Sequence, residues 1–153
     1  MNNSRYFSST PPVVLNLIII NALMLLATEL LPVGNRIVGA LALFNVESPL
    51  FHSYQLVTYM FLHGGFSHLF FNMFALWMFG RTLEQVWGPK RFLFYYILCG
   101  IGAGLVQEGV QYIQYVTELV NYEGVNTGVA VIPMAEYLNL MTTVGASGAV
   151  YAI

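Results

Sequence analysis

Long apolar runs separated by short polar turns dominate the pattern along the chain. A helix needs about 20 consecutive apolar residues to cross the hydrocarbon core of a bilayer. We predict three complete spans and the start of a fourth, over residues 13–31, 67–86, 91–108 and 143–153. The pattern therefore predicts an all-α protein, a multi-pass transmembrane helical bundle.

The segments outside these spans differ in character. Residues 1–12 are polar and end in two prolines, which predicts a flexible N-terminal tail before a partial membrane domain over residues 13–153. Residues 32–66 contain short apolar stretches, at 36–44 and 54–62, that are too short to cross a membrane. Because a plain solvated loop would be more polar, we predict that residues 32–66 form an outer loop lying in the membrane interface.

The composition excludes several classes of protein. Hydrophobic residues make up 58% of the chain and charged residues only 8%, whereas a soluble domain carries about 25% charged residues. The five basic residues form no patch, so nucleic acid is not an expected partner. The lipid bilayer is the expected environment, and the chain is predicted to be an integral membrane protein.

The distribution of charge predicts the orientation in the membrane. Three basic residues, Arg81, Lys90 and Arg91, lie around the turn between the second and third spans. Residues 92–153 contain no lysine or arginine but four glutamates. Basic residues concentrate on the cytoplasmic side, so we predict a cytoplasmic N-terminus in the cell (plasma) membrane, with residues 32–66 outside.

Three polar side chains with catalytic potential fall in one layer of this topology. His68 and Asn72 are four residues apart in the second span, hence on one helical face, and Ser147 lies early in the fourth. At 1.5 Å per residue the three lie within roughly 8 Å of depth of one another, just below the outer surface. Polar groups inside a bilayer are costly and by default indicate a functional site. A serine nucleophile needs a base and donors for an oxyanion, and the ring N–H of His68 and the amide of Asn72 are suitable donors.

Each of these features also has a structural interpretation. Gly145 and Gly148 alone would indicate close helix packing. His63 and His68 would make a poor metal site, because no cysteine or aspartate accompanies them, and we expect neither a metal nor a cofactor. The chain contains no aspartate, so it cannot supply a Ser-His-Asp triad. Ala149 stands where the nucleophile elbow of a soluble hydrolase requires glycine.

Taken together, three motifs resemble the rhomboid family of intramembrane serine proteases. The strongest is the run HGGFSHLFFN over residues 63–72. The second comprises residues of the turn after the second span, namely Gly80, Glu84, Gly88 and Arg91-Phe92. The third resembles the family's nucleophile motif and is Gly145-Ala146-Ser147-Gly148. Each motif alone is weak, but their order and spacing are highly specific.

The resemblance implies a role for each site residue. Ser147 would be the nucleophile, and His68 and Asn72, together with the backbone N–H of Ser147, would form the oxyanion site. His63 would be a structural or hydrogen-bonding residue of the outer loop. Where many family members carry Trp-Arg in this loop, the present chain has Tyr54-Gln55.

The resemblance further implies six helices in the complete protein, with a general-base histidine on the sixth helix. Gly145 and Gly148 would allow that helix to approach closely. The sequence is then expected to be a C-terminally truncated piece that is inactive as written. Substrates would be single-pass transmembrane proteins cut near the outer membrane boundary.

Two other functions remain open from the sequence. The first is a catalytically inactive rhomboid-like module that binds client transmembrane helices. The second is a channel or carrier, which would require polar residues spread through the depth of several spans rather than gathered in one layer.

Overall fold

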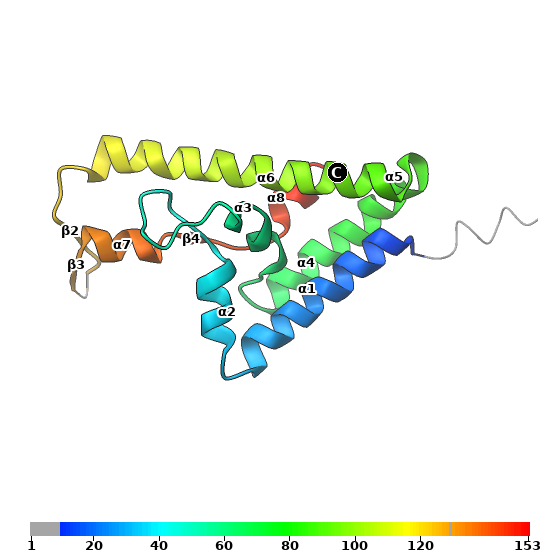
Figure 1. Ribbon diagram of the computed structural model, residues 1–153, viewed down its shortest axis with the longest axis horizontal. Coiled ribbons are helices and arrows are strands. Elements are labelled where there is room, and N and C mark those ends of the chain that lie inside the picture. The colour runs from blue at the N-terminus through cyan, green and yellow to red at the C-terminus, as the bar shows by residue number, and fades with distance from the viewer. Residues whose placement is uncertain (1–9, 129) are drawn as a thin grey trace, which may run out of the picture.

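The computed structural model describes residues 10–128 and 130–153 and is mostly helical (Figure 1). The predicted flexible tail falls largely on residues 1–9, which lie outside the described residues. Among these described residues, two helices are long and apolar enough to cross a membrane, Pro12–Leu30 and Pro89–Leu119.

Helix α1 (Pro12–Leu30) and the second helical stretch lie side by side (Figure 1). The second stretch consists of α4 (Phe66–Ala75), a π-helical turn η3 (Leu76–Gly80) and α5 (Arg81–Trp87). It ends at Gly88, which has a positive φ of 81° that favours glycine. The π-turn shifts the helical register between the two α-helical parts without breaking the path.

Helix α6 (Pro89–Gln114) continues through a second π-turn, η4 (Tyr115–Leu119). The predicted membrane span ends at residue 108, and the helix itself continues beyond it through the amphipathic residues, where no proline interrupts it. At 1.5 Å per residue, α6 and η4 together extend about 46 Å, well beyond the roughly 30 Å hydrocarbon core.

The smaller elements all lie to one side of α6 (Figure 1). These are the first-loop elements α2 (Gly34–Leu41), β1 (Leu43–Phe44), α3 (Gln55–Thr58) and the 3-10 turn η2 (Tyr59–Phe61), and the later elements β2 (Gly124–Asn126), β3 (Val131–Pro133), α7 (Met134–Leu140), β4 (Thr142–Thr143) and α8 (Ser147–Val150). The predicted helical class is confirmed as a mostly helical fold, in which two short antiparallel strand pairs, β1–β4 and β2–β3, accompany the helices.

The fourth predicted span also begins later than expected. Thr142 and Thr143 pair with Phe44 and Leu43 as strand β4, and the helix α8 starts only at Ser147. β-Branched threonines suit a strand, and Gly145 with φ 122° interrupts the helical conformation. This pairing ties the chain just before Ser147 to the first loop.

The core lies where α1, α6 and the second helical stretch meet. Gly80 is the point of closest approach, because a Cβ there would lie 3.0 to 3.2 Å from side-chain atoms of Leu76, Phe92 and Val14. Phe92 and Tyr96 of α6 are fully buried beside it. A residue without a side chain at position 80 thus lets three helices pack together.

Gln55 anchors the loop over residues 32–66 from inside it. Its side chain is fully buried. Its Oε1 accepts hydrogen bonds from the backbone N–H groups of His52 (3.0 Å) and Phe44 (3.5 Å), and its Nε2 donates to the carbonyl groups of Leu50 (3.0 Å) and Ala40 (3.4 Å). One amide side chain therefore ties together four backbone groups between residues 40 and 52.

We expect Gln55→Leu to destabilise the folded chain by roughly 2–4 kcal/mol, because it leaves buried backbone groups without partners. Thermal unfolding of the detergent-solubilised chain measures this loss. Tyr54→Phe is the matched control, since Tyr54 is exposed and its hydroxyl makes one bond to Ala40. Equal effects of the two substitutions would contradict the anchoring role of Gln55.

Candidate active site

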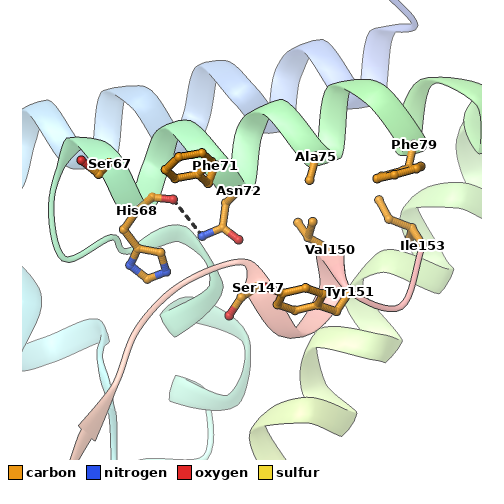
Figure 2. A pocket seen from close by; sticks show the side chains of 10 residues that line it. All are labelled: Ser67, His68, Phe71, Asn72, Ala75, Phe79, Ser147, Val150, Tyr151 and Ile153. Atoms are coloured by element: carbon orange, nitrogen blue, oxygen red, sulfur yellow. Dashed lines mark hydrogen bonds between the residues drawn. The ribbon is translucent and has the colours of Figure 1, made fainter.

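His68 and Asn72 project from the first turns of α4 toward the segment that carries α8 (Figure 2). Asn72 is buried, and its Nδ2 donates a hydrogen bond to the carbonyl oxygen of His68 at 3.0 Å. An amide nitrogen has two hydrogens, so the second N–H of Asn72 stays free for another acceptor while the first fixes the side chain.

The ring of His68 is oriented by contacts on two sides. The backbone N–H of Gly64 donates to Nδ1 at 3.4 Å, so in the neutral ring the proton resides on Nε2. The other edge lies against Gly145, where an added Cβ would be 2.7 Å from Cε1 and 2.8 Å from Nε2 of the ring. Only glycine at position 145 leaves room for this imidazole, whose Nε2–H faces the Ser147 segment.

Ser147 is the first residue of α8 and is half-buried. Its position depends on Tyr59, a residue that the sequence analysis did not identify. The carbonyl oxygen of Tyr59 accepts a hydrogen bond from Gly145 N–H at 2.9 Å, and its hydroxyl donates to Gly100 of α6 at 2.7 Å. No sequence signal marks this role, because the contacts join segments 41 to 86 residues apart.

Gly148 brings α8 against α6. A Cβ at this position would collide with the Cβ of Ala103. The resemblance implied that Gly145 and Gly148 would let a sixth helix approach, which stays a prediction. Among the described residues, the helix that approaches Gly148 is α6. Gly100 and Gly104 of α6 are also closely packed, against Met60 and Tyr59, whereas Gly102 has open space around it.

These elements enclose a cleft of about 680 Å³ that is open on one side. It is lined by Ser67, His68, Phe71, Asn72, Ala75, Phe79, Ser147, Val150, Tyr151 and Ile153 (Figure 2). The polar groups gather at one end, and the apolar side chains line the rest. First-turn N–H groups of a helix lack intrahelical partners, so the amide of Ser147 adds another donor to the polar end.

His63 lies behind this site and does not line the cleft. It is buried, and its ring stands edge-on to that of His68 with centroids 5.0 Å apart. Within the part of the chain that the structure describes, neither of its nitrogens has a hydrogen-bond partner, and no third ligand joins the pair to form a metal site. Burial, followed by repulsion from His68, lowers the pKa of His63 to about 4.

This lowered pKa predicts a loss of stability in acid. The unfolded chain binds a proton near pH 6.5 and the folded chain only near pH 4, so folding should weaken as the pH falls through this window and level off below it. The total loss is about 3 kcal/mol. Melting temperatures measured from pH 8 to 4 in detergent should show this decline.

His63→Phe should flatten the decline, whereas His52→Gln, which replaces an exposed histidine stacked on Tyr54, should leave it in place. An unchanged pH dependence in His63→Phe would contradict the assignment.

The comparisons with known proteins all point to the same family. The model of the Rhomboid family, described as the rhomboid domain, matches residues 51–153. The chain is 39% identical over 71 residues to RHOMBOID-like protein 5 of Arabidopsis thaliana, 44% identical over 48 residues to rhomboid protease GluP of Bacillus subtilis (strain 168), and 40% identical over 53 residues to Rhomboid-like protein 11, chloroplastic, of Arabidopsis thaliana.

The matched segments cover only part of each protein. They amount to 46%, 31% and 35% of this chain, and to 22%, 10% and 19% of the three relatives. The matched family domain includes each sequence-predicted site residue. The domain match and the two long apolar helices together support an integral membrane protein.

Proposed function

This chain belongs to the rhomboid family, and from that premise we propose that it is part of an intramembrane serine endopeptidase. The observation that carries the proposal is that Ser147, His68 and Asn72, up to 79 positions apart in sequence, line one cleft. In this proposal the chain supplies the nucleophile and the oxyanion donors, and a histidine beyond residue 153 supplies the general base.

The proposed reaction begins with attack of Ser147 Oγ on the carbonyl carbon of the scissile peptide bond. The histidine base takes the hydroxyl proton and returns it to the leaving amine, which leaves an acyl ester on Ser147. Water then attacks the ester while the same base takes one of its protons. The base passes that proton to Ser147 Oγ as the ester bond breaks, which releases the acid product and restores the serine. The negative charge on the carbonyl oxygen is stabilised at both stages by the Nε2–H of His68, the free Nδ2–H of Asn72 and the N–H of Ser147.

The orientation of His68 supports its role as a donor rather than as the base. A base needs a ring nitrogen with a free lone pair, and the hydrogen bond from Gly64 occupies the lone pair of Nδ1. The other nitrogen then carries a proton and can only donate. The general base must therefore come from another residue, as the proposal requires.

The proposed substrates are single-pass transmembrane proteins cut near the outer membrane face. Their peptide bonds become accessible there once the helix unwinds, because an intact helix engages and shields the carbonyl groups. The proposed orientation, with a cytoplasmic N-terminus in the plasma membrane, rests on the clustering of Arg81, Lys90 and Arg91 around a single turn.

The experiment that tests this function uses the complete protein. Its coding sequence downstream of residue 153 should encode a histidine in a later apolar span. The purified complete protein in liposomes should cleave a single-pass transmembrane substrate. A complete chain without such a histidine and without cleavage would contradict the proposal and favour the inactive module that binds client helices.

Removing one oxyanion donor should slow the reaction without abolishing it. We expect Asn72→Ala in the complete protein to lower kcat about 10²- to 10³-fold with little change in KM. Asn21→Ala is the matched control, because Asn21 is also buried and also donates its Nδ2 to the carbonyl four residues earlier (Leu17, 2.8 Å). A similar loss of kcat in both variants would mean that Asn72 affects the rate by stabilising the fold and not by donating a hydrogen bond to the oxyanion.

A further inference from the structure

Four aromatic side chains form a ladder along one face of the path from α4 into η3. Phe66, Phe70 and Phe74 follow one another at four-residue intervals, and Trp77 follows after three, so all four share a face. Successive ring centroids lie 6.3, 6.1 and 6.3 Å apart. Their exposed fractions are 74%, 50%, 48% and 41%, so the ladder is an open surface.

This ladder is one wall of an apolar groove of about 280 Å³ between α4 and α1. Ile18 and Ala22 of α1 form the opposite wall. The residues that line the groove differ from those that line the cleft around Ser147. The groove is therefore separate from the proposed catalytic site, and no polar side chain lines it.

A second pocket of about 380 Å³, lined by Trp77, Met78, Arg81, Thr82 and Gln85, adjoins the groove at Trp77. Trp77 lines both spaces, and Arg81, Thr82 and Gln85 line only the second. The guanidinium carbon of Arg81 lies 5.9 Å from the centroid of the Trp77 ring. The Nε2 of Gln85 is a buried donor that has no hydrogen-bond partner within the described residues. Among the described residues that line the pocket, Arg81 is the charged one.

We propose that the groove and the pocket together bind one phospholipid with an anionic headgroup. Arg81 pairs with the phosphate, and Thr82 and Gln85 donate hydrogen bonds to its oxygens. One acyl chain lies along the aromatic ladder from Trp77 toward Phe70.

The dimensions and the charge both fit this ligand. Arg81 and Phe70 are 11 positions apart, which corresponds to about 16 Å along a helix, close to half of the roughly 30 Å hydrocarbon core. Arg81 supplies a positive charge at the pocket itself, and basic residues beside a membrane attract anionic lipid. A zwitterionic headgroup would place its ammonium group near this positive charge.

The test titrates phosphatidylglycerol in mixed micelles into the full 153-residue chain and follows the melting temperature and the lipid adducts seen by native mass spectrometry. We expect one phosphatidylglycerol adduct and a saturable rise in melting temperature. Phosphatidylcholine should bind at least tenfold more weakly, and glycerol phosphate, which has no acyl chain, should cause no shift. Equal binding of the two lipids, or an equal shift with glycerol phosphate, would overturn the proposal.

Two variants separate headgroup from chain recognition. Arg81→Gln should weaken phosphatidylglycerol binding at least tenfold, whereas Lys90→Gln, which removes the same charge outside the pocket, should stay within about twofold of the parent. Ala22→Phe should fill the groove and block the adduct while leaving Arg81 in place. Equal effects of the two charge variants, or full binding by Ala22→Phe, would overturn the proposal.

Discussion

Ser147→Ala in the complete protein is expected to abolish cleavage of a transmembrane substrate. Removing the nucleophile of a serine protease costs about 10⁶-fold in kcat, a larger effect than any other single substitution considered for this site. The substitution removes one oxygen from a half-buried side chain and leaves the backbone contacts of Gly145 and the helix α8 unchanged. Loss of activity should therefore occur without loss of folding, and a thermal melt of the variant checks this.

The matched control is a second serine in the same cleft. Ser67 lines the cleft beside His68, at the start of α4, but its side chain points away from Ser147 (Figure 2). Ser67→Ala should keep activity within a few-fold of the parent. Cleavage that survives Ser147→Ala, or that is lost equally in Ser67→Ala, would show that Ser147 is not the nucleophile.

Glu84→Ala is expected to cause the largest loss of stability. The carboxylate is buried, with 2% of the residue exposed. Its Oε1 accepts a hydrogen bond from Val13 N–H at 2.9 Å, and its Oε2 accepts one from Val14 N–H at 2.8 Å. These first-turn amides of α1 have no partner within their own helix. Glu84 thus joins α5 to the start of α1 across 70 positions of sequence.

The expected loss is roughly 3–5 kcal/mol for Glu84→Ala, because two charge-assisted hydrogen bonds disappear and two backbone donors stay buried. Glu84→Gln should lose roughly 2–3 kcal/mol, since its NH₂ group would face a backbone donor. Thermal unfolding in detergent measures both.

Glu29→Gln is the control, because Glu29 is an exposed glutamate near the other end of α1 and should change stability by less than about 0.5 kcal/mol. A Glu84→Gln variant as stable as the parent would contradict the capping role.

The long apolar helices could be predicted from the sequence, although not all of their ends. The proximity of the three site residues could be predicted as well. The spacing of His68 and Asn72 on one helical face follows from the helical period. The prediction that these residues and Ser147 lie at a similar depth in the membrane follows from the distribution of basic residues and from the rise of 1.5 Å per residue in a helix. The structure brings the three into one cleft, but their catalytic roles remain predictions.

Other features could not be read from the sequence, because they depend on pairing between distant segments. Thr142 and Thr143 join strand β1 rather than a helix, and Tyr59 holds Gly145 through a backbone carbonyl group that has no sequence signature. The partner of Glu84 is likewise a pair of backbone amides 70 positions away. The role of Gln55 as a loop anchor was equally hidden, because its four hydrogen bonds all reach backbone atoms.

Covalent labelling of the complete protein with a fluorophosphonate, followed by mass-spectrometric mapping of the modified residue, tests the proposed mechanism most directly. Such a reagent reacts with a serine that a base has activated, so it reports the chemistry at the hydroxyl itself. We expect a single modification on Ser147, which should be absent from Ser147→Ala and accompanied by loss of substrate cleavage. Modification of Ser67 instead, or an unmodified Ser147 in a protein that still cleaves its substrate, would contradict the assignment of Ser147 as the nucleophile.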